Sequence, residues 1–234
     1  MGYMRFIRGL FLGMMMMLCL TGSVRADELE YRFEIGGMVG GSCYYGDANY
    51  SSLMKNLNIM GGIVGRYNIN PRMAVKASLS MARISGSTAD TDNRFPGGDV
   101  EFSRTIYDFG AQFECNLFAY GDASGYKSTS RFAPYIFAGI GVTFAPKPAK
   151  NVFSPNIPLG IGVKYKIAPR LNLGCELSFR FTMSDELDVT SETAPILNDP
   201  YGIKSGGLKN KDSYSFLSIS VTYDFSPKYR KCNN

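Results

Sequence analysis

Residues 170–183 alternate between apolar and polar side chains, and the same alternation recurs along most of the chain. The odd positions from Leu171 to Met183 are apolar, whereas the even positions from Asn172 to Thr182 are small, polar or charged. Because successive side chains point to opposite faces of a strand, this segment has one apolar and one polar face. It is longer than a usual strand of about 5–6 residues and fits the tilted strand of about 9–11 residues that crosses a bilayer.

Seven further segments share this pattern. They lie at residues 29–39, 57–69, 73–81, 104–117, 135–144, 156–167 and 217–225. Compact turns at Pro71 and Pro169 and a connection near Ser124 alternate with generally longer polar loops, among them residues 41–55, 85–100 and 184–212. Short turns at one end and long loops at the other predict an all-β fold, an eight-stranded antiparallel transmembrane barrel of the outer-membrane type.

The main alternative is a soluble β-sandwich or lipocalin-like fold, which would also bury one apolar face of each strand. Such a fold has no need of aromatic residues at both ends of its strands. Tyr223 and Phe225 near the end of the last segment also resemble the carboxy-terminal signal of outer-membrane barrels. These features favour the membrane barrel, with short turns in the periplasm and long loops outside the cell.

The inward positions of the predicted strands carry charges of both signs. They are Glu30, Arg32, Glu34, Arg66, Lys76, Arg104, Asp108, Glu114, Lys164, Lys166, Glu176, Arg180 and Asp224. Eight strands leave an interior just wide enough for side chains to fill, and charges there are stable only when paired. We therefore predict a plugged lumen held by ion pairs. The alternative, a charge-lined pore, requires more strands.

The amino-terminal residues predict export from the cytoplasm. Arg5 and Arg8 precede an apolar run over residues 10–20, and small residues lead to Ala26, so residues 1–26 are predicted to be a secretory signal peptide cut after Ala26. A lipoprotein signal at Cys19 is the weaker alternative, because bulky Leu18 precedes it. Residues 27–226 would then form the barrel and residues 227–234 a short periplasmic tail, which places the mature chain in the outer membrane.

Composition narrows the function further. The formal charge of +5 falls to about +2 without the three arginines of the signal peptide, which argues against nucleic-acid binding. The chain has no histidine, the usual general base of acyl-transfer sites, and its cysteines are widely spaced. We predict a non-enzyme with no catalytic residues, no cofactor, no metal site and no small-molecule substrate. In the tail, Lys228, Arg230 and Lys231 form either a solvated end or a contact for an acidic periplasmic partner.

Several stretches resemble PorG-like outer-membrane proteins of Bacteroidetes, the barrels associated with the type IX secretion system. The matching pieces are GGSCYYGDAN (40–49), GRYNINPRMAVKASLSMARISG (65–86), YDFGAQFECNLFAYG (107–121), APYIFAGIG (133–141) and IPLGIGVKYKIAPRLNLGCELSFRFTMSDELDVTS (157–191). The resemblance implies a non-enzymatic barrel that contacts outer-membrane lipid and, on its periplasmic side, the lipoprotein of the secretion ring. The alternative from another class is a stand-alone surface barrel or adhesin that acts through its long loops.

Overall fold

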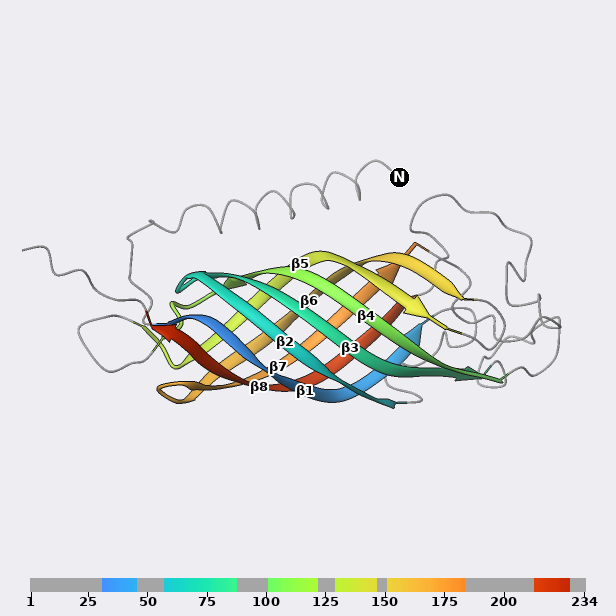
Figure 1. Cartoon of the computed structure of the whole chain (residues 1–234), viewed down its shortest axis with the longest axis horizontal. Helices are drawn as coiled ribbons and strands as arrows, with labels where there is room; N and C mark the ends of the chain where they lie inside the picture. The colour runs from blue at the N-terminus through green and yellow to red at the C-terminus, as the bar shows by residue number, and fades with distance from the viewer. Residues whose placement is uncertain are drawn as a thin grey trace, which may run out of the picture.

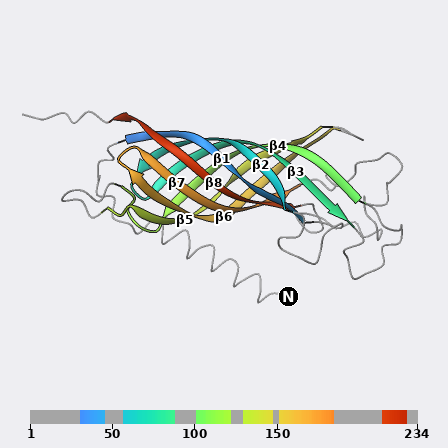
Figure 2. The ribbon, with the colours of Figure 1, turned by 90° about the horizontal axis from the view of Figure 1, so that it is seen from below.

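Eight antiparallel strands close into a barrel, which confirms the fold predicted from the alternation. The computed structural model describes residues 31–45, 57–87, 101–121, 129–146, 151–183 and 213–227. The strands are β1 (Tyr31–Tyr45), β2 (Asn58–Asn70), β3 (Met73–Ser87), β4 (Glu101–Asn116), β5 (Phe132–Ala145), β6 (Val152–Ala168), β7 (Leu171–Thr182) and β8 (Ser213–Pro227). Each pairs with its neighbours in chain order, and the strands run at a steep tilt around one elongated barrel (Figures 1 and 2).

The two ends of the barrel differ. One end, which we call the turn end, holds the first residue of β1 and the last of β8, Tyr31 and Pro227, which lie opposite each other. It also holds the turns Pro71–Arg72 and Pro169–Arg170, and it lies at the left in Figure 1. We call the opposite end the loop end, because the longest connection, β7–β8 (residues 183–212), leaves from it. Proline suits both turns, since it presets the backbone and has no N–H to donate to a ladder.

The outer wall of the barrel is apolar. Large hydrophobic side chains on the outward positions are exposed, with Ile59 at 87%, Ile140 at 74% and Phe153 at 70%. Most buried side chains of the inward positions are instead polar or charged, so the usual distribution of a water-soluble protein is inverted. This alternation of apolar-out and polar-in residues is that of a transmembrane barrel.

Aromatic side chains mark both ends of the apolar wall. Toward the turn end, the Phe33 ring lies 4.9 Å from the Tyr67 ring and 5.6 Å from the Phe225 ring, centroid to centroid. Toward the loop end, Tyr107 and Phe144 are exposed on neighbouring strands. Such girdles lie at the two membrane–water interfaces of barrels of this type.

Several strands are longer at the loop end than the sequence predicted. β1 continues to Tyr45 and β3 to Ser87, where loops were expected from residues 41 and 85. Ser42 still pairs with Asn58 on one side and Phe216 on the other. The expectation was wrong because small and polar residues mark the end of the apolar wall, whereas backbone pairing continues beyond it.

The seam between β1 and β8 depends on glycine. A Cβ atom added at Gly36 would lie 1.9 Å from the carbonyl oxygen of Val221, and one at Gly40 would lie 2.0 Å from that of Leu217. No side chain fits in either place, so glycine allows the first and last strands to approach closely. The seam runs from Tyr31 opposite Pro227 to Tyr45 opposite Ser213.

A membrane-spanning helix and a disulfide bond are both absent from the described residues. No helix within these ranges is long and apolar enough to span a membrane. Among the described cysteines, Cys43, Cys115 and Cys175 form no disulfide. Cys175 is exposed and Cys115 half-buried on outward positions of their strands, where a thiol behaves as a small hydrophobic group.

The outer wall predicts a depth-dependent response to charge. Leu79, in β3, is 50% exposed between Ile63 and Phe109 on the neighbouring strands. We expect Leu79→Arg to lower the free energy of folding into lipid vesicles by roughly 2–4 kcal/mol, because the charge enters the apolar wall. Since the chain has no tryptophan, the folded fraction is best measured from the electrophoretic mobility of unheated samples across a urea series.

Leu57→Arg is the matched control. Leu57 is 58% exposed and directly precedes β2 at the loop end, where a charge should cost roughly 0–1 kcal/mol. Equal losses for the two variants would contradict a lipid-facing wall centred on the barrel.

Candidate functional site

The lumen gathers most of the charged residues predicted to face inward. Those that are buried are Glu34, Arg66, Lys76, Arg104, Asp108, Glu114, Lys164, Lys166, Arg180 and Asp224, and Glu176 is half-buried. Strand alternation directs them inward, and the register of neighbouring strands brings opposite charges together. They form two groups, one toward the turn end and one toward the loop end.

Glu114 is the centre of the first group. Its carboxylate accepts a hydrogen bond from Lys164 at 2.5 Å and lies 2.9 Å from Nε of Arg66. Lys76 lies 3.8 Å away from the same carboxylate. Three cations from β2, β3 and β6 therefore converge on one fully buried carboxylate of β4.

Three further carboxylates complete this group, which we call the turn-side network. Arg66 also binds Glu34 at 2.5 Å, Lys76 binds Glu176, and Lys166 binds Asp224 at 2.6 Å. The network thus joins four cations (Arg66, Lys76, Lys164 and Lys166) to four carboxylates (Glu34, Glu114, Glu176 and Asp224). Balanced charge matters because an unpaired ion in a dry interior is costly.

Neutral side chains donate further hydrogen bonds to two of these carboxylates, Glu34 and Asp224. Asn68 donates to Glu34 at 2.7 Å, and Thr222 donates to it at 3.0 Å. Asn172 donates to Asp224 at 2.6 Å and accepts from the Tyr120 hydroxyl at 2.7 Å. Burial raises the pKa of Tyr120, which keeps its hydroxyl protonated and able to donate.

Asp108 is the centre of the second group, nearer the loop end. It accepts from Arg180 at 2.8 Å, from the Tyr214 hydroxyl at 2.6 Å and from Asn156 at 2.8 Å. Thr143 lies 2.7 Å from the Tyr214 hydroxyl and extends the group to β5. These bonds connect β4, β5, β6, β7 and β8 across the lumen.

Aromatic rings cover the lumenal cations. The Lys164 ammonium lies 4.6 Å from the centre of the Tyr135 ring, and that of Lys76 lies 5.0 Å from the Phe137 ring. The Arg180 guanidinium lies 4.3 Å from the Phe216 ring. Cation–π contacts of this kind are strongest where water is excluded, so the rings both fill space and stabilise the charges.

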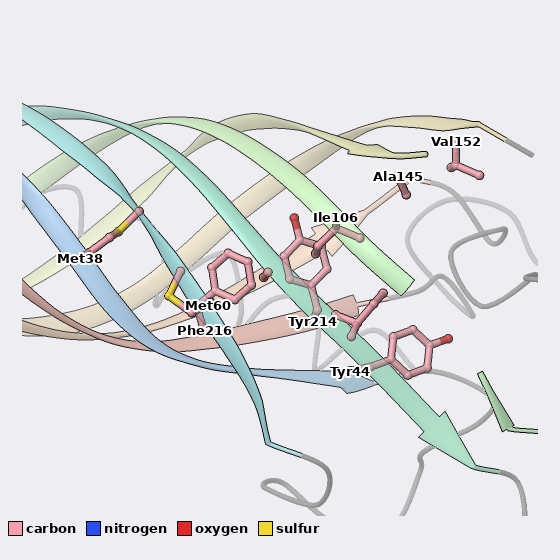
Figure 3. Packing of buried hydrophobic residues seen from close by; sticks show 10 residues of the cluster. Met38, Tyr44, Met60, Ile106, Ala145, Val152, Tyr214 and Phe216 are labelled. Carbon is pink, nitrogen blue, oxygen red and sulfur yellow. The ribbon is translucent and has the colours of Figure 1, made fainter. Parts of the chain in front are cut away.

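An apolar plug occupies the lumen toward the loop end, beside the Asp108 group and the buried Arg104. Its members are Met38, Tyr44, Met60, Ala82, Ile84, Ile106, Ala145, Val152, Tyr214 and Phe216. Figure 3 shows these side chains distributed along the barrel, from Met38 to Tyr44 and Val152 near the loop end. Tyr214 and Phe216 belong to the plug and also contact the Asp108–Arg180 pair. The sequence indicated a charged filling and did not indicate this apolar layer.

Two predicted lumenal residues differ from the rest. Arg32 was expected in the ion-pair network, but it is exposed, because β1 begins at Tyr31 and this position lies on the open rim of the turn end. Arg104 is buried, and its guanidinium donates to the carbonyl oxygens of Ala145 and Pro146, at 2.8 and 3.2 Å. Glu30 and the tail residues Lys228, Arg230 and Lys231 lie outside the described residues.

Three uncharged residues that bond within the lumenal groups, Asn156, Asn172 and Tyr120, were not predicted from the sequence. Asn156 and Asn172 occupy inward positions, and strand parity alone could have identified them. Tyr120 lies in the connection between β4 and β5, where parity gives no information. Its backbone forms a bridge with Ser130, and its hydroxyl enters the network by donating to Asn172. Among the described residues, no cluster of histidine, cysteine, aspartate or glutamate has the geometry to hold a metal ion.

The arrangement of strands and lumen can be compared with known proteins. A family model described as a domain of unknown function (DUF6089) matches residues 10–234. The chain belongs to the DUF6089 family. No curated protein matches it.

Among solved structures, the DUF6089 chain is similar to three bacterial barrels. It is 15% identical to Neisserial surface protein A, with a TM-score of 0.46 and coverage of 82% of this chain and 97% of that one. It is 10% identical to the amino-terminal barrel domain of Pseudomonas aeruginosa OprF, with a TM-score of 0.48 and coverage of 85% of this chain and 100% of that one. It is 12% identical to Ail, the attachment invasion locus protein of Yersinia pestis, with a TM-score of 0.47 and coverage of 84% of this chain and 100% of that one. The barrel assignment of the DUF6089 chain rests on its own strand pairing.

The geometry around Glu114 predicts a large loss of stability when its charge is removed. Glu114→Gln leaves Arg66, Lys76 and Lys164 facing an amide, and we expect it to lower the unfolding free energy of the DUF6089 barrel by roughly 3–5 kcal/mol. Urea unfolding from lipid vesicles, followed by gel mobility, measures this change. Glu114→Asp keeps the charge and should lose less. Wild-type stability of Glu114→Gln would show that the lumenal charges are not coupled.

Proposed function

We propose that this DUF6089 protein is a non-enzymatic outer-membrane barrel that serves as an anchor in the type IX secretion complex. The observation that carries the anchoring role is the filled lumen. Ion pairs occupy its turn-side half, and its loop-side half holds the apolar plug together with the Asp108–Arg180 pair. A barrel filled in this way offers its two ends and its outer wall for interaction rather than a path through its centre.

The proposal includes the processing and location of the chain. Residues 1–26 act as the signal peptide, residues 27–226 form the barrel and residues 227–234 form a periplasmic tail. The apolar wall and its two aromatic girdles support insertion into the outer membrane, since a closed barrel satisfies all backbone hydrogen bonds within lipid. The turn end then faces the periplasm, as in other barrels with short turns on that side.

The secretion role is supported by the resemblance to PorG-like proteins. Its longest matching stretch, residues 157–191, includes the β6–β7 hairpin at the turn end. The partner we propose is the lipoprotein of the periplasmic secretion ring, contacted through this end and through Lys228, Arg230 and Lys231. The second candidate is a stand-alone surface barrel or adhesin, favoured by the longer connections at the loop end, such as residues 184–212.

The filled lumen predicts an absence of conductance. In planar lipid bilayers, we expect the purified barrel to give no discrete current steps, because the pairs around Glu114 and the apolar plug leave no continuous aqueous path. A porin purified in the same detergent provides the positive control. Reproducible single-channel steps from the folded barrel would contradict the anchoring role and favour a pore.

Deletion of the gene tests the secretion role directly. We expect the deletion strain to retain type IX cargo inside the cell, and expression of the wild-type chain to restore export. Replacing Lys228, Arg230 and Lys231 with glutamine should leave the barrel in the outer membrane but lower co-purification of the ring lipoprotein, most strongly at low salt.

Two outcomes would contradict parts of this proposal. Normal cargo export in the deletion strain would exclude the secretion role and favour the adhesin, whose loss would show in surface attachment. Unchanged co-purification after the tail substitutions, with export still dependent on the gene, would assign the contact to the turns at Pro71 and Pro169.

A further inference from the structure

The outer surface of the barrel carries positive charge at the turn end. Four arginines are exposed there, Arg32, Arg72, Arg131 and Arg170, and each belongs to a different strand end or turn. Among the described side chains, every carboxylate instead faces the lumen. The turn end therefore presents cations to its surroundings, while the acidic residues that are described balance charges inside.

Arg170 lies against the outer wall. Its Nε donates to the Tyr31 hydroxyl at 3.1 Å, and its Nη1 donates to the Tyr223 hydroxyl at 3.2 Å. The guanidinium also lies 5.2 Å from the centre of the Tyr31 ring. Tyr223 is 47% exposed on the outward face of β8, so its contact holds the Arg170 guanidinium beside the apolar wall.

The hydrogen bonds to the two tyrosines hold this side chain in one orientation. Arginine is cationic at every physiological pH, and these bonds raise the pKa of Arg170 further above its ordinary value. A fixed cation that is exposed on the wall differs from a mobile surface arginine, because less conformational entropy is lost when it binds an anion.

The depth of this cluster follows from its neighbours. Tyr223 lies two positions before Phe225, whose ring stacks on Phe33 in the turn-end girdle. Aromatic girdles lie at the level of the lipid headgroups. Arg170 is in the turn just beyond the girdle, which is the depth at which phospholipid phosphates lie.

We propose that Arg170, Tyr31 and Tyr223 form a binding site for the phosphate of a phospholipid headgroup in the periplasmic leaflet. The guanidinium has five N–H groups, and the two bonds to tyrosine use two of them. Each tyrosine oxygen accepts from Arg170, which leaves its own O–H to donate. The site thus combines a cation with several donors, the arrangement that phosphate oxygens require.

The position of Arg170 favours lipid over an acidic protein as the ligand. A periplasmic protein would approach the end of the barrel along its axis, whereas the tyrosines hold this guanidinium beside the wall, where acyl chains pack. The apolar side chains of Leu173 and Val221, both exposed on the same face, would contact those chains. This inference rests on insertion into the outer membrane and is independent of the secretion role.

Native mass spectrometry of the full chain in a maltoside detergent tests the site. Phosphatidylglycerol is titrated into wild type and Arg170→Gln, and diacylglycerol with the same acyl chains serves as the probe that lacks phosphate. We expect Arg170→Gln to weaken phosphatidylglycerol binding by about tenfold, since a hydrogen bond to a charged group is worth about that factor. Tyr223→Phe removes only a hydroxyl and should weaken it by about threefold.

Arg83→Gln is the matched control, because Arg83 is exposed at the loop end, where it donates to Ser103 at 2.8 Å. It should bind phosphatidylglycerol as wild type does, and gel mobility confirms that each variant is folded. Equal binding by Arg170→Gln and wild type, or equal binding of diacylglycerol, would overturn the proposal. Displacement of the lipid by equimolar inorganic phosphate would identify a site for free phosphate instead.

Discussion

The pairing of buried charge is the constraint on which this barrel depends. An eight-stranded barrel has an interior that side chains fill, so a charged lumenal residue must find its partner among other residues of the same chain. Glu114 illustrates the solution, because cations from three strands meet on its carboxylate. The apolar outer wall imposes the opposite requirement on alternate positions. Each strand therefore faces the lumen on one side and the apolar outer wall on the other, and its alternation of polar and apolar side chains reflects both.

The side chains that fill the lumen differ between its two ends. Toward the turn end, ion pairs and amide side chains satisfy one another, with aromatic rings against the ammonium groups of Lys76 and Lys164. Toward the loop end, methionine, isoleucine and aromatic side chains fill most of the space around the Asp108–Arg180 pair and Arg104. Arg180 stands at the boundary, where it binds Asp108 on one side and lies over Phe216 on the other. Both halves therefore hold buried side chains, charged in one and largely apolar in the other.

Much of this architecture could be predicted from the sequence, because strand parity is a local property. Parity gave the eight strands and the inward position of residues such as Glu114 and Arg180. The partners of those residues depend on register and on contacts across the lumen, which parity does not contain. Arg32 has inward parity, but it is exposed on the rim, because β1 begins only one residue before it. The extension of β1 to Tyr45 was missed because apolar periodicity detects contact with lipid rather than backbone pairing.

The glycine-lined seam between β1 and β8 has a consequence for how the protein reaches its native state. The bond from Thr222 to Glu34 crosses this seam and joins residues 188 positions apart, and the bond from Tyr214 to Asp108 joins residues 106 apart. Closing such long stretches of chain carries an entropic penalty before their contacts form, which makes high-contact-order proteins slow to fold. The carboxy-terminal strand supplies Asp224 and Thr222 to the turn-side network, so that network is incomplete until β8 arrives. Assembly is thereby coupled to completion of the chain, and a truncated product lacks both its closing strand and its charge balance.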